Sequence, residues 1–329
     1  MTLQRRLTVF ALLTTLAVAT LCVAALCGGS GCVMPAQAGD LVWQLRLPRA
    51  LSAFAVGGSL ALAGALMQLL LRNPLADPYV LGVSGGAATG AMAMSWWAPA
   101  ALAAFGMQLG ALAGALLATT LLFGLARRAL MSMNPGLNPA LSASPSGVRL
   151  ILTGVMISAG FGALMTLFLS LAPDAQLRGM VFWLMGELDT GEFAGAAWVA
   201  LAVVLVWSVW HANALNVLAH GETTAQLLGV PVRRLRIAAL LMASLATASA
   251  VAVAGAIGFV GLVVPHALRL VLGNDQRVLL PASVLAGGGA LTLADLLARS
   301  VVAPVQLPVG VITAIVGVPV FLALLTRSR

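Results

Sequence analysis

The sequence predicts an all-α membrane protein with about ten transmembrane helices. Of its 329 residues, 61% are hydrophobic and only 8% are charged, and the mean hydropathy is +1.06. A soluble domain carries about 25% charged residues, so lipid must solvate much of this chain. A β-barrel would show alternating apolar and polar residues, whereas the apolar runs here are continuous and rich in Ala, Leu and Gly. Helices of roughly 20 residues are therefore expected.

Apolar runs bounded by charged residues, Pro or Gly define the expected spans. The first run follows Arg5 and Arg6. It is longer than the apolar part of a signal peptide and lacks an A-x-A site directly after it, so we expect a retained span. The eighth run is short and contains Pro265. A single transmembrane domain, 1–329, is thus expected, with spans at approximately 7–27, 49–71, 79–97, 101–126, 149–172, 194–212, 237–255, 257–272, 281–298 and 308–326.

Arginine predicts the orientation. With the N-terminus in the cytoplasm, the outer side holds four of the 17 arginines, Arg46, Arg49, Arg178 and Arg299, and the remaining 13 lie inside. Cytoplasmic loops carry the excess of positive charge, so this orientation is favoured, and an even number of spans leaves both termini cytoplasmic. Two halves of five spans would then be inverted relative to each other, as in many transporters.

Two polar stretches and several small-residue patterns accompany the spans. The longest polar cytoplasmic stretch is 213–236, and the outer segment 173–193 contains a sequence, LRGMVFWLMG, that predicts a short amphipathic surface helix. Small residues four positions apart let helices approach closely. They occur in three sets: Gly82, Gly86 and Gly90; Gly106, Gly110 and Gly114; Gly154, Ser158 and Gly162.

The composition excludes several function classes. Every basic residue is Arg, and an ordinary P-loop needs a Lys to hold the nucleotide phosphates, so an ATP-driven step needs a partner chain. His211, His220 and His266 are far apart, and Cys and His show no metal-binding spacing. We therefore expect no catalytic residue, metal site or cofactor in this chain. Basic patches with interleaved aromatic residues are missing, so nucleic-acid binding is not indicated.

Asp295 and the cysteines each allow two interpretations. Arg299 lies four residues after Asp295 on the same helix face. The pair either caps the span locally or holds Arg299 outward for a partner. Cys27 and Cys32 are either small apolar packing residues or a disulfide, if their end faces an oxidising compartment.

Five segments contain distinctive sequence motifs. They read WQLRLPR at 43–49, RNPLADP at 72–78 followed by YVLGVSGGA, AGAIGFVGLVVPH at 254–266, LLP at 279–281 and LPVGVITAIVGVP at 307–319. Pro and Gly alone mark them as helix boundaries. Together, in this order, they resemble the FecCD-type permeases, the family of bacterial ABC importers for ferric siderophores, haem and vitamin B12. The likeness begins near residue 40, and the loop 128–148 looks longer than is usual in the family.

The resemblance implies a vitamin-B12-permease-like fold and a set of partners. Such permeases are homodimers in the bacterial inner membrane. Two ATPase subunits, which bind ATP and Mg, lie below, and a periplasmic binding protein docks above. By position, Arg46 and Arg299 resemble the arginines that meet acidic residues of the binding protein. Asn73 and Leu75 match the inner gate. The loop 213–236 matches the ATPase-coupling segment, with Gly221, Glu222, Gln226 and Gly229 as its candidate residues.

The resemblance also places a translocation path along the dimer interface, lined by the fifth and tenth spans. Their apolar walls suit a large flat molecule, and Met adapts to its shape. Haem or another iron or cobalt chelate is therefore the expected cargo, with ferric siderophores and vitamin B12 as alternatives. An ion-coupled secondary carrier would need mid-span charges, which are few. The candidate path residues are Met156, Phe161, Met165, Phe168, Gly310, Thr313 and Gly317.

Overall fold

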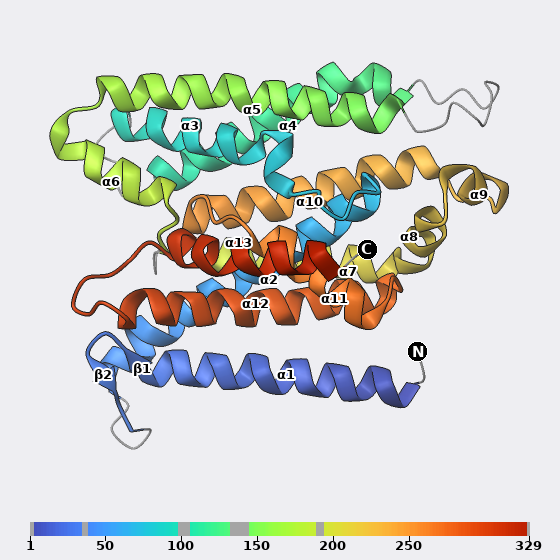
Figure 1. Ribbon diagram of the computed structural model, residues 1–329. Helices are drawn as coiled ribbons and strands as arrows, with labels where there is room; N and C mark the ends of the chain where they lie inside the picture. The colour runs from blue at the N-terminus through green and yellow to red at the C-terminus, as the bar shows by residue number, and fades with distance from the viewer. Residues whose placement is uncertain (1–2, 35–38, 98–105, 132–144, 189–193, 328–329) are drawn as a thin grey trace.

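Each of the ten predicted spans overlaps a helix in the computed structural model, which describes residues 3–34, 39–97, 106–131, 145–188 and 194–327. The helices run side by side in one bundle (Figure 1). Parts of three predicted segments, 101–105, 132–144 and 189–193, lie outside the described residues. The helices are α1 (Leu3–Leu26), α2 (Leu47–Leu70), α3 (Val83–Trp97), α4 (Gly106–Met131), α5 (Pro145–Leu171), α7 (Ala194–Trp210), α10 (Val232–Ala254), α11 (Val260–Leu272), α12 (Gln276–Ser300) and α13 (Val309–Arg327).

Not all of these helices could cross a membrane alone. Among the described residues, six are long and apolar enough, and the pair α7 and α8 (Ala212–Ala219), bent by 65°, would make a seventh. The helices α11 and α13 are shorter apolar segments. The all-α membrane fold is confirmed. The number of about ten spans is approximate, because the long helices, the bent pair and the two short helices make nine candidates among the described residues.

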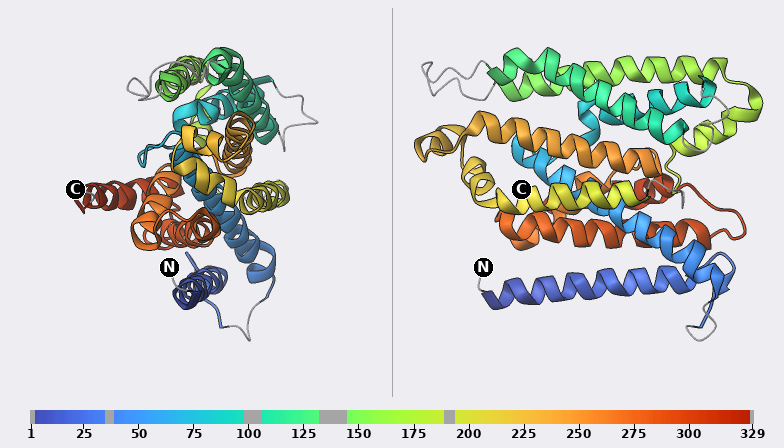
Figure 2. Two further views of the ribbon diagram at one scale, coloured as in Figure 1. Left: turned by 90° about the vertical axis from the view of Figure 1, so that its right-hand side faces the viewer. Right: turned by 180° about the vertical axis from the view of Figure 1, so that it is seen from behind.

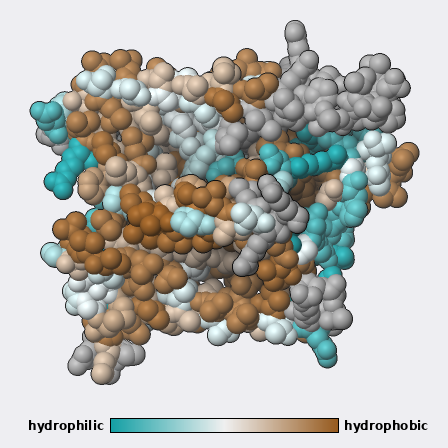
Figure 3. All heavy atoms as spheres, in the orientation of Figure 1, coloured by the Kyte–Doolittle hydropathy of each residue, from teal (hydrophilic) through white to brown (hydrophobic). Residues whose placement is uncertain are grey.

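Short elements mark the two ends of the bundle. One end carries α8 and α9 (Glu222–Leu227), together with both chain termini (Figures 1 and 2). The other end carries the predicted surface helix, α6 (Asp174–Leu184), and the hairpin of β1 (Cys27–Gly28) and β2 (Gly31–Cys32). The arginine bias makes the first end cytoplasmic, and hydrophobic side chains dominate the face between the two ends (Figure 3).

The helix α2 forms the centre of the bundle. In the region of its span, 94% of the residues are buried, against α12, α10, α11 and α7. Glycines allow the close approach: a Cβ at Gly57 would meet the backbone of Gly287, and one at Gly64 would meet the backbone of Gly261, at under 3.0 Å in both cases. Gly86 and Gly90 of α3 interlock in the same way with Gly110 and Gly114 of α4.

Two interruptions move the predicted helix boundaries. The third helix begins at Val83 because a 3₁₀ turn, η3 (Pro78–Leu81), precedes it, with the Asp77 carboxylate capping the turn. The backbone between α10 and α11 is not helical, and Phe259 there has a φ of +70°. The Tyr79 hydroxyl joins the two interruptions, because it donates to the Ile257 carbonyl (2.8 Å) and accepts from the Ile257 N–H (3.0 Å).

Candidate docking and coupling sites

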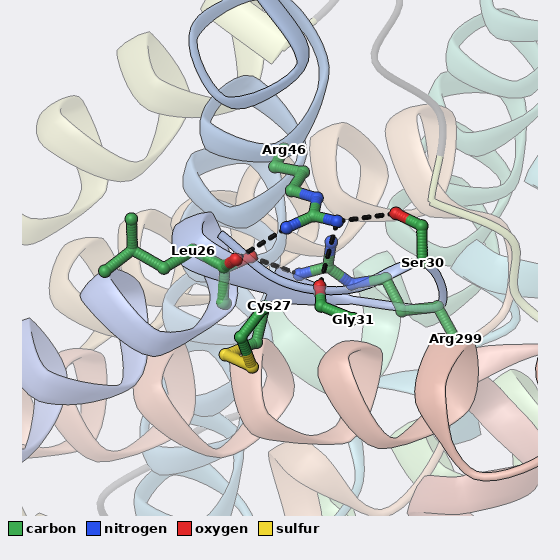
Figure 4. Close-up of a disulfide and its surroundings, with 8 residues drawn as sticks. Leu26, Cys27, Ser30, Gly31, Arg46 and Arg299 are labelled. Carbon is green, nitrogen blue, oxygen red and sulfur yellow. Dashed lines mark hydrogen bonds between the residues drawn. A yellow bond between two sulfur atoms is a disulfide. The ribbon is translucent and has the colours of Figure 1, made fainter. Parts of the chain in front are cut away.

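At the outer end, two arginines lie beneath the β1–β2 hairpin (Figure 4). The first, Arg46, ends a π-helical turn, η2 (Leu41–Arg46). Its guanidinium donates to the Leu26 carbonyl, the Ser30 hydroxyl (2.8 Å) and the Gly31 carbonyl (3.1 Å). Arg299 of α12 donates to the Ala24 carbonyl. The two residues are only 5% and 6% exposed, so both are held within the chain, and their docking role stays a prediction.

The carboxylate of Asp295 joins α12 to the start of α2. It accepts a hydrogen bond from Arg49 (2.9 Å) and lies 3.3 Å from the Arg299 guanidinium, and its side chain is fully buried. Arg49 also donates to Gln306 (3.1 Å). The local pair with Arg299 was predictable from the spacing. The role of Arg49 was missed, although the RLPR segment places a second arginine three residues after Arg46.

The cysteines resolve into one disulfide and one thiol. Cys27 and Cys32 are bonded across the β1–β2 ladder, which selects the second of the two interpretations that the sequence allowed. Cys22, on the exposed side of α1, is free. The bond lies at the outer end of the bundle, the end that faces an oxidising compartment in a bacterial inner membrane.

At the cytoplasmic end, the predicted gate residues form a tight turn after α2. The Asn73 amide oxygen accepts from the Leu75 N–H (2.9 Å), and the Asn73 N–H donates to the Gln68 carbonyl (3.2 Å). The Leu75 side chain is exposed. Asn73 therefore shapes the turn, and Leu75 projects from it; their role as an inner gate stays a prediction.

The predicted coupling loop is largely helical. Gly221 precedes α9 with a φ of +132°, and Gly229 follows it with a φ of +78°, conformations that favour glycine. Glu222 pairs with Arg236 of α10 (2.6 Å), and Gln226 is exposed. The ion pair fixes α9 to the base of α10, so that one face of α9 points away from the bundle.

An apolar pair at the end of α9 was missed from the sequence. Leu227 and Leu228 are 84% and 67% exposed beyond the membrane end of the bundle. Water there makes exposed apolar surface unfavourable, so we expect this pair to contact a partner. The signal was present as two leucines next to Gly229 within an otherwise polar stretch.

Replacing Leu227 and Leu228 by Ala is expected to weaken binding of a purified partner ATPase about 30-fold. Burying two leucines at an interface contributes at least about 2 kcal/mol. Surface plasmon resonance on the detergent-solubilised protein measures the change. The matched control is Leu116→Ala with Leu117→Ala, an equally adjacent, exposed pair on α4, and an equal loss in both variants would contradict the assignment.

A polar clasp ties α8 to the beginning of α12. The Asn216 amide donates to Asp275 (2.8 Å) and accepts from the Gln276 N–H (2.7 Å). Arg6 of α1 and Arg277 also pair with Asp275, at 2.8 and 3.2 Å. Partial burial alone would raise the pKa of Asp275, but hydrogen bonds from Asn216 and Arg277 outweigh it and hold that pKa below its usual value. The clasp thus joins three elements through one ionised carboxylate.

Asn216→Ala is expected to reduce the stimulation of ATP hydrolysis by the binding protein about fivefold, with basal hydrolysis retained. The variant removes both hydrogen bonds that join α8 to α12, which corresponds to ~1 kcal/mol of coupling. Hydrolysis by the reconstituted complex, with and without binding protein, measures it. His220→Ala serves as control, because that ring bonds only a carbonyl of the preceding turn. Undiminished stimulation in Asn216→Ala would show that the clasp does not couple.

The predicted path residues do not share one exposed face. On α5, Met156 is exposed, whereas Phe161 is buried against α3. Met165 packs against the main core, and Phe168 makes edge contacts with Trp96 and Trp97.

The three predicted residues of α13 also face inward. A Cβ at Gly310 would meet the Met185 carbonyl, Thr313 is buried, and a Cβ at Gly317 would meet the Phe259 ring. Ile315 and Val316 occupy the exposed side of α13 instead. The assignment of the predicted residues to a path stays a prediction.

Residues 7–327 match the FecCD transport family. The chain is 41% identical, over 336 positions, to the vitamin B12 import system permease protein BtuC of Salmonella paratyphi A and to that of Salmonella typhi, with 99% of this chain and 97% of each relative covered. A solved protein assigned as a metal-chelate type ABC transporter, in an inward-facing conformation, has a TM-score of 0.84 at 30% identity over 98% of this chain and 99% of its own. PsaBC from Streptococcus pneumoniae shares the fold, with a TM-score of 0.56 at 17% identity over 87% and 93%.

Proposed function

The chain belongs to the FecCD transport family and is a permease subunit of an ABC importer in the bacterial inner membrane; from that premise we propose that it imports a cobalt corrinoid of the vitamin B12 type. The 41% identity to the vitamin B12 permeases, which extends over 99% of this chain, carries the proposal. Haem is the second candidate, because the apolar exposed faces of α5 and α13 suit a large flat chelate.

The proposal includes a homodimer, two ATPase subunits and a periplasmic binding protein. The exposed apolar side chains of α5 and α13 support a dimer contact along these helices, which lie at the edge of the bundle in the end-on view of Figure 2. The chain has no Lys and hence no ordinary P-loop, which supports a separate ATPase. The exposed leucines at the end of α9 support docking of that ATPase there.

An ion-coupled carrier is the weaker alternative. Such a carrier needs ionisable side chains along the middle of its spans. Among the described residues, the fully buried Asp, Glu and Arg side chains are Arg46, Arg236, Asp295 and Arg299, and all four lie near helix ends. Proton or ion movement through the middle of this bundle therefore has no chain of carboxylates to follow.

Reconstitution with the partner ATPase and binding protein tests the proposal. Cobalamin, haem and a ferric siderophore are each offered to proteoliposomes, and uptake and ATP hydrolysis are measured. We expect cobalamin to give the largest ATP-dependent uptake. Uptake of haem alone would show that the proposed cargo is wrong, and the proposed importer function would still stand. Uptake that needs an ion gradient and no ATPase would overturn the importer itself.

A further inference from the structure

The β1–β2 hairpin and the end of α1 together supply hydrogen-bond acceptors for the two outer arginines. Arg299 donates to the Ala24 carbonyl and Arg46 to the Leu26 carbonyl, both in the last turn of α1, and Arg46 also donates to Ser30 and Gly31 beyond the first strand. Figure 4 shows the Arg46 guanidinium between Leu26 on one side and Ser30 and Gly31 on the other, with the Arg299 guanidinium next to it. A Cβ at Gly28 would be 3.3 Å from an Arg299 nitrogen and 3.4 Å from an Arg46 nitrogen.

The Cys27–Cys32 disulfide is what keeps this hairpin closed. The β ladder pairs only two residues on each strand, and such a short ladder is not stable in water on its own. Ser30 and Gly31 are exposed. A hydrogen bond from the Val33 N–H to the Leu26 carbonyl (2.9 Å) and the close approach of Gly29 to the Arg299 backbone also support the hairpin. Without the covalent bond, we expect Ser30 and Gly31 to be held less firmly, which would weaken two of the three hydrogen bonds of Arg46.

The cluster beneath the hairpin carries excess positive charge. The Asp295 carboxylate pairs with the guanidiniums of Arg49 and Arg299, and the guanidinium of Arg46 lies beside that of Arg299 under Gly28. The local net charge of about +2 at this end of the bundle attracts an acidic protein and repels a basic one. The position of that charge depends on where the hairpin holds Arg46 and Arg299.

We propose that the disulfide-closed hairpin Cys27–Cys32 is the positioning element of an interaction surface for an acidic protein partner, the importer's own binding protein. The hairpin covers the two arginines and fixes their guanidiniums. Its exposed turn contacts the partner, and the positive charge of the arginines attracts that partner. The proposal rests on the proposed function, because that function supplies the partner. It assigns Cys27 and Cys32 a role that the positions of the arginines alone do not require.

The test compares Cys27→Ser with Cys32→Ser, as a double variant, against Cys22→Ser. Cys22 lies on the same helix but is free, so it controls for cysteine replacement. Binding-protein affinity is measured on dimers in lipid nanodiscs at low and high salt. We expect the double variant to bind about tenfold more weakly and with a smaller dependence on salt. Cys22→Ser should match the wild type in affinity and in its dependence on salt.

Chemical reduction of the folded, assembled wild type tests the same proposal without requiring that the double variant fold correctly. Dithiothreitol, with the free thiols counted by maleimide labelling, should lower the affinity of the wild type and of Cys22→Ser, and should leave the double variant unchanged. Unaltered affinity after complete reduction would overturn the role proposed for the disulfide. The proposed importer function would still stand if the binding protein stimulated ATP hydrolysis by the wild type. Failure of the oxidised wild type to bind any binding protein would overturn both.

Discussion

Gly64→Ala is expected to reduce the yield of folded permease at least tenfold. The added Cβ would lie under 3.0 Å from three backbone atoms of Gly261, and backbone cannot rotate away as a side chain can. The helices α2 and α11 would have to separate. That separation would also break the hydrogen bond from the Gln68 amide to the Leu262 carbonyl (3.0 Å). Overpacking of this kind costs about 3 kcal/mol or more, in the most buried helix of the fold.

Gly124→Ala is the matched control for that substitution. Gly124 lies in α4 with no atom within 4 Å of a built Cβ, and Ala is the better helix former by about 1 kcal/mol. Size-exclusion chromatography of solubilised membranes measures the folded fraction of both. If Gly64→Ala gave a monodisperse peak as large as that of Gly124→Ala, the close approach of α2 and α11 would be refuted.

Asp295→Ala is expected to lower the free energy of unfolding by about 3–5 kcal/mol. The carboxylate is fully buried between Arg49 and Arg299, and removal of one partner leaves buried charges uncompensated. Thermal unfolding in detergent, followed by tryptophan fluorescence, measures the loss. Asp40→Asn, at an exposed position on the same side of the membrane, should unfold as the wild type does.

A second substitution separates charge from packing. In Asp295→Ala with Arg299→Met, the buried guanidinium is replaced by an apolar side chain. Arg49 keeps its hydrogen bond to Gln306 and reaches solvent, since its side chain is 19% exposed. About half of the lost stability should return. A double variant less stable than Asp295→Ala would mean that Arg299 stabilises the outer end independently of the carboxylate.

The helices were predictable because a helix that spans lipid needs a long, continuous run of apolar residues. Continuous apolar runs place α1, α5 and α12 to within a few residues, and the arginine bias places both termini at one end. The helix boundaries at η3 and between α10 and α11 were less well predicted. There the backbone is stabilised by the Tyr79–Ile257 hydrogen bonds, between residues far apart in the chain.

Which small residues meet other helices could not be read from their spacing. Gly110 and Gly114 interlock with α3, whereas Gly162, in an equally regular set, has nothing within 4 Å of a built Cβ. The spacing places residues on one face of a helix, but the face turned toward a neighbour depends on the whole bundle. The same holds for Gly310 and Gly317, whose common face packs inward.

The outer arginines illustrate a second limit. Sequence position and charge bias predict that Arg46 and Arg299 lie at the same end of the bundle, opposite the termini, yet neither reveals that both are buried against the end of α1 and the hairpin that follows it. Three of their acceptors, at Ala24, Leu26 and Gly31, are backbone carbonyls, which every residue carries, so no side-chain pattern predicts those contacts. The ion pair between Asp295 and Arg299, by contrast, joins residues four positions apart on one helix, so their spacing was sufficient to predict it.

The first helix is held by polar contacts at both ends and packs against α12 between them. Arg6 pairs with Asp275 at the cytoplasmic end, and Arg299 and Arg46 hold the carbonyls of Ala24 and Leu26 at the outer end. The stretch from Arg6 to Leu26 spans about 30 Å, close to the hydrocarbon thickness of a typical bilayer. These contacts oppose independent tilting of α1 in a thicker or thinner membrane. We therefore expect a change in lipid chain length to act on α12 and the outer hairpin through α1.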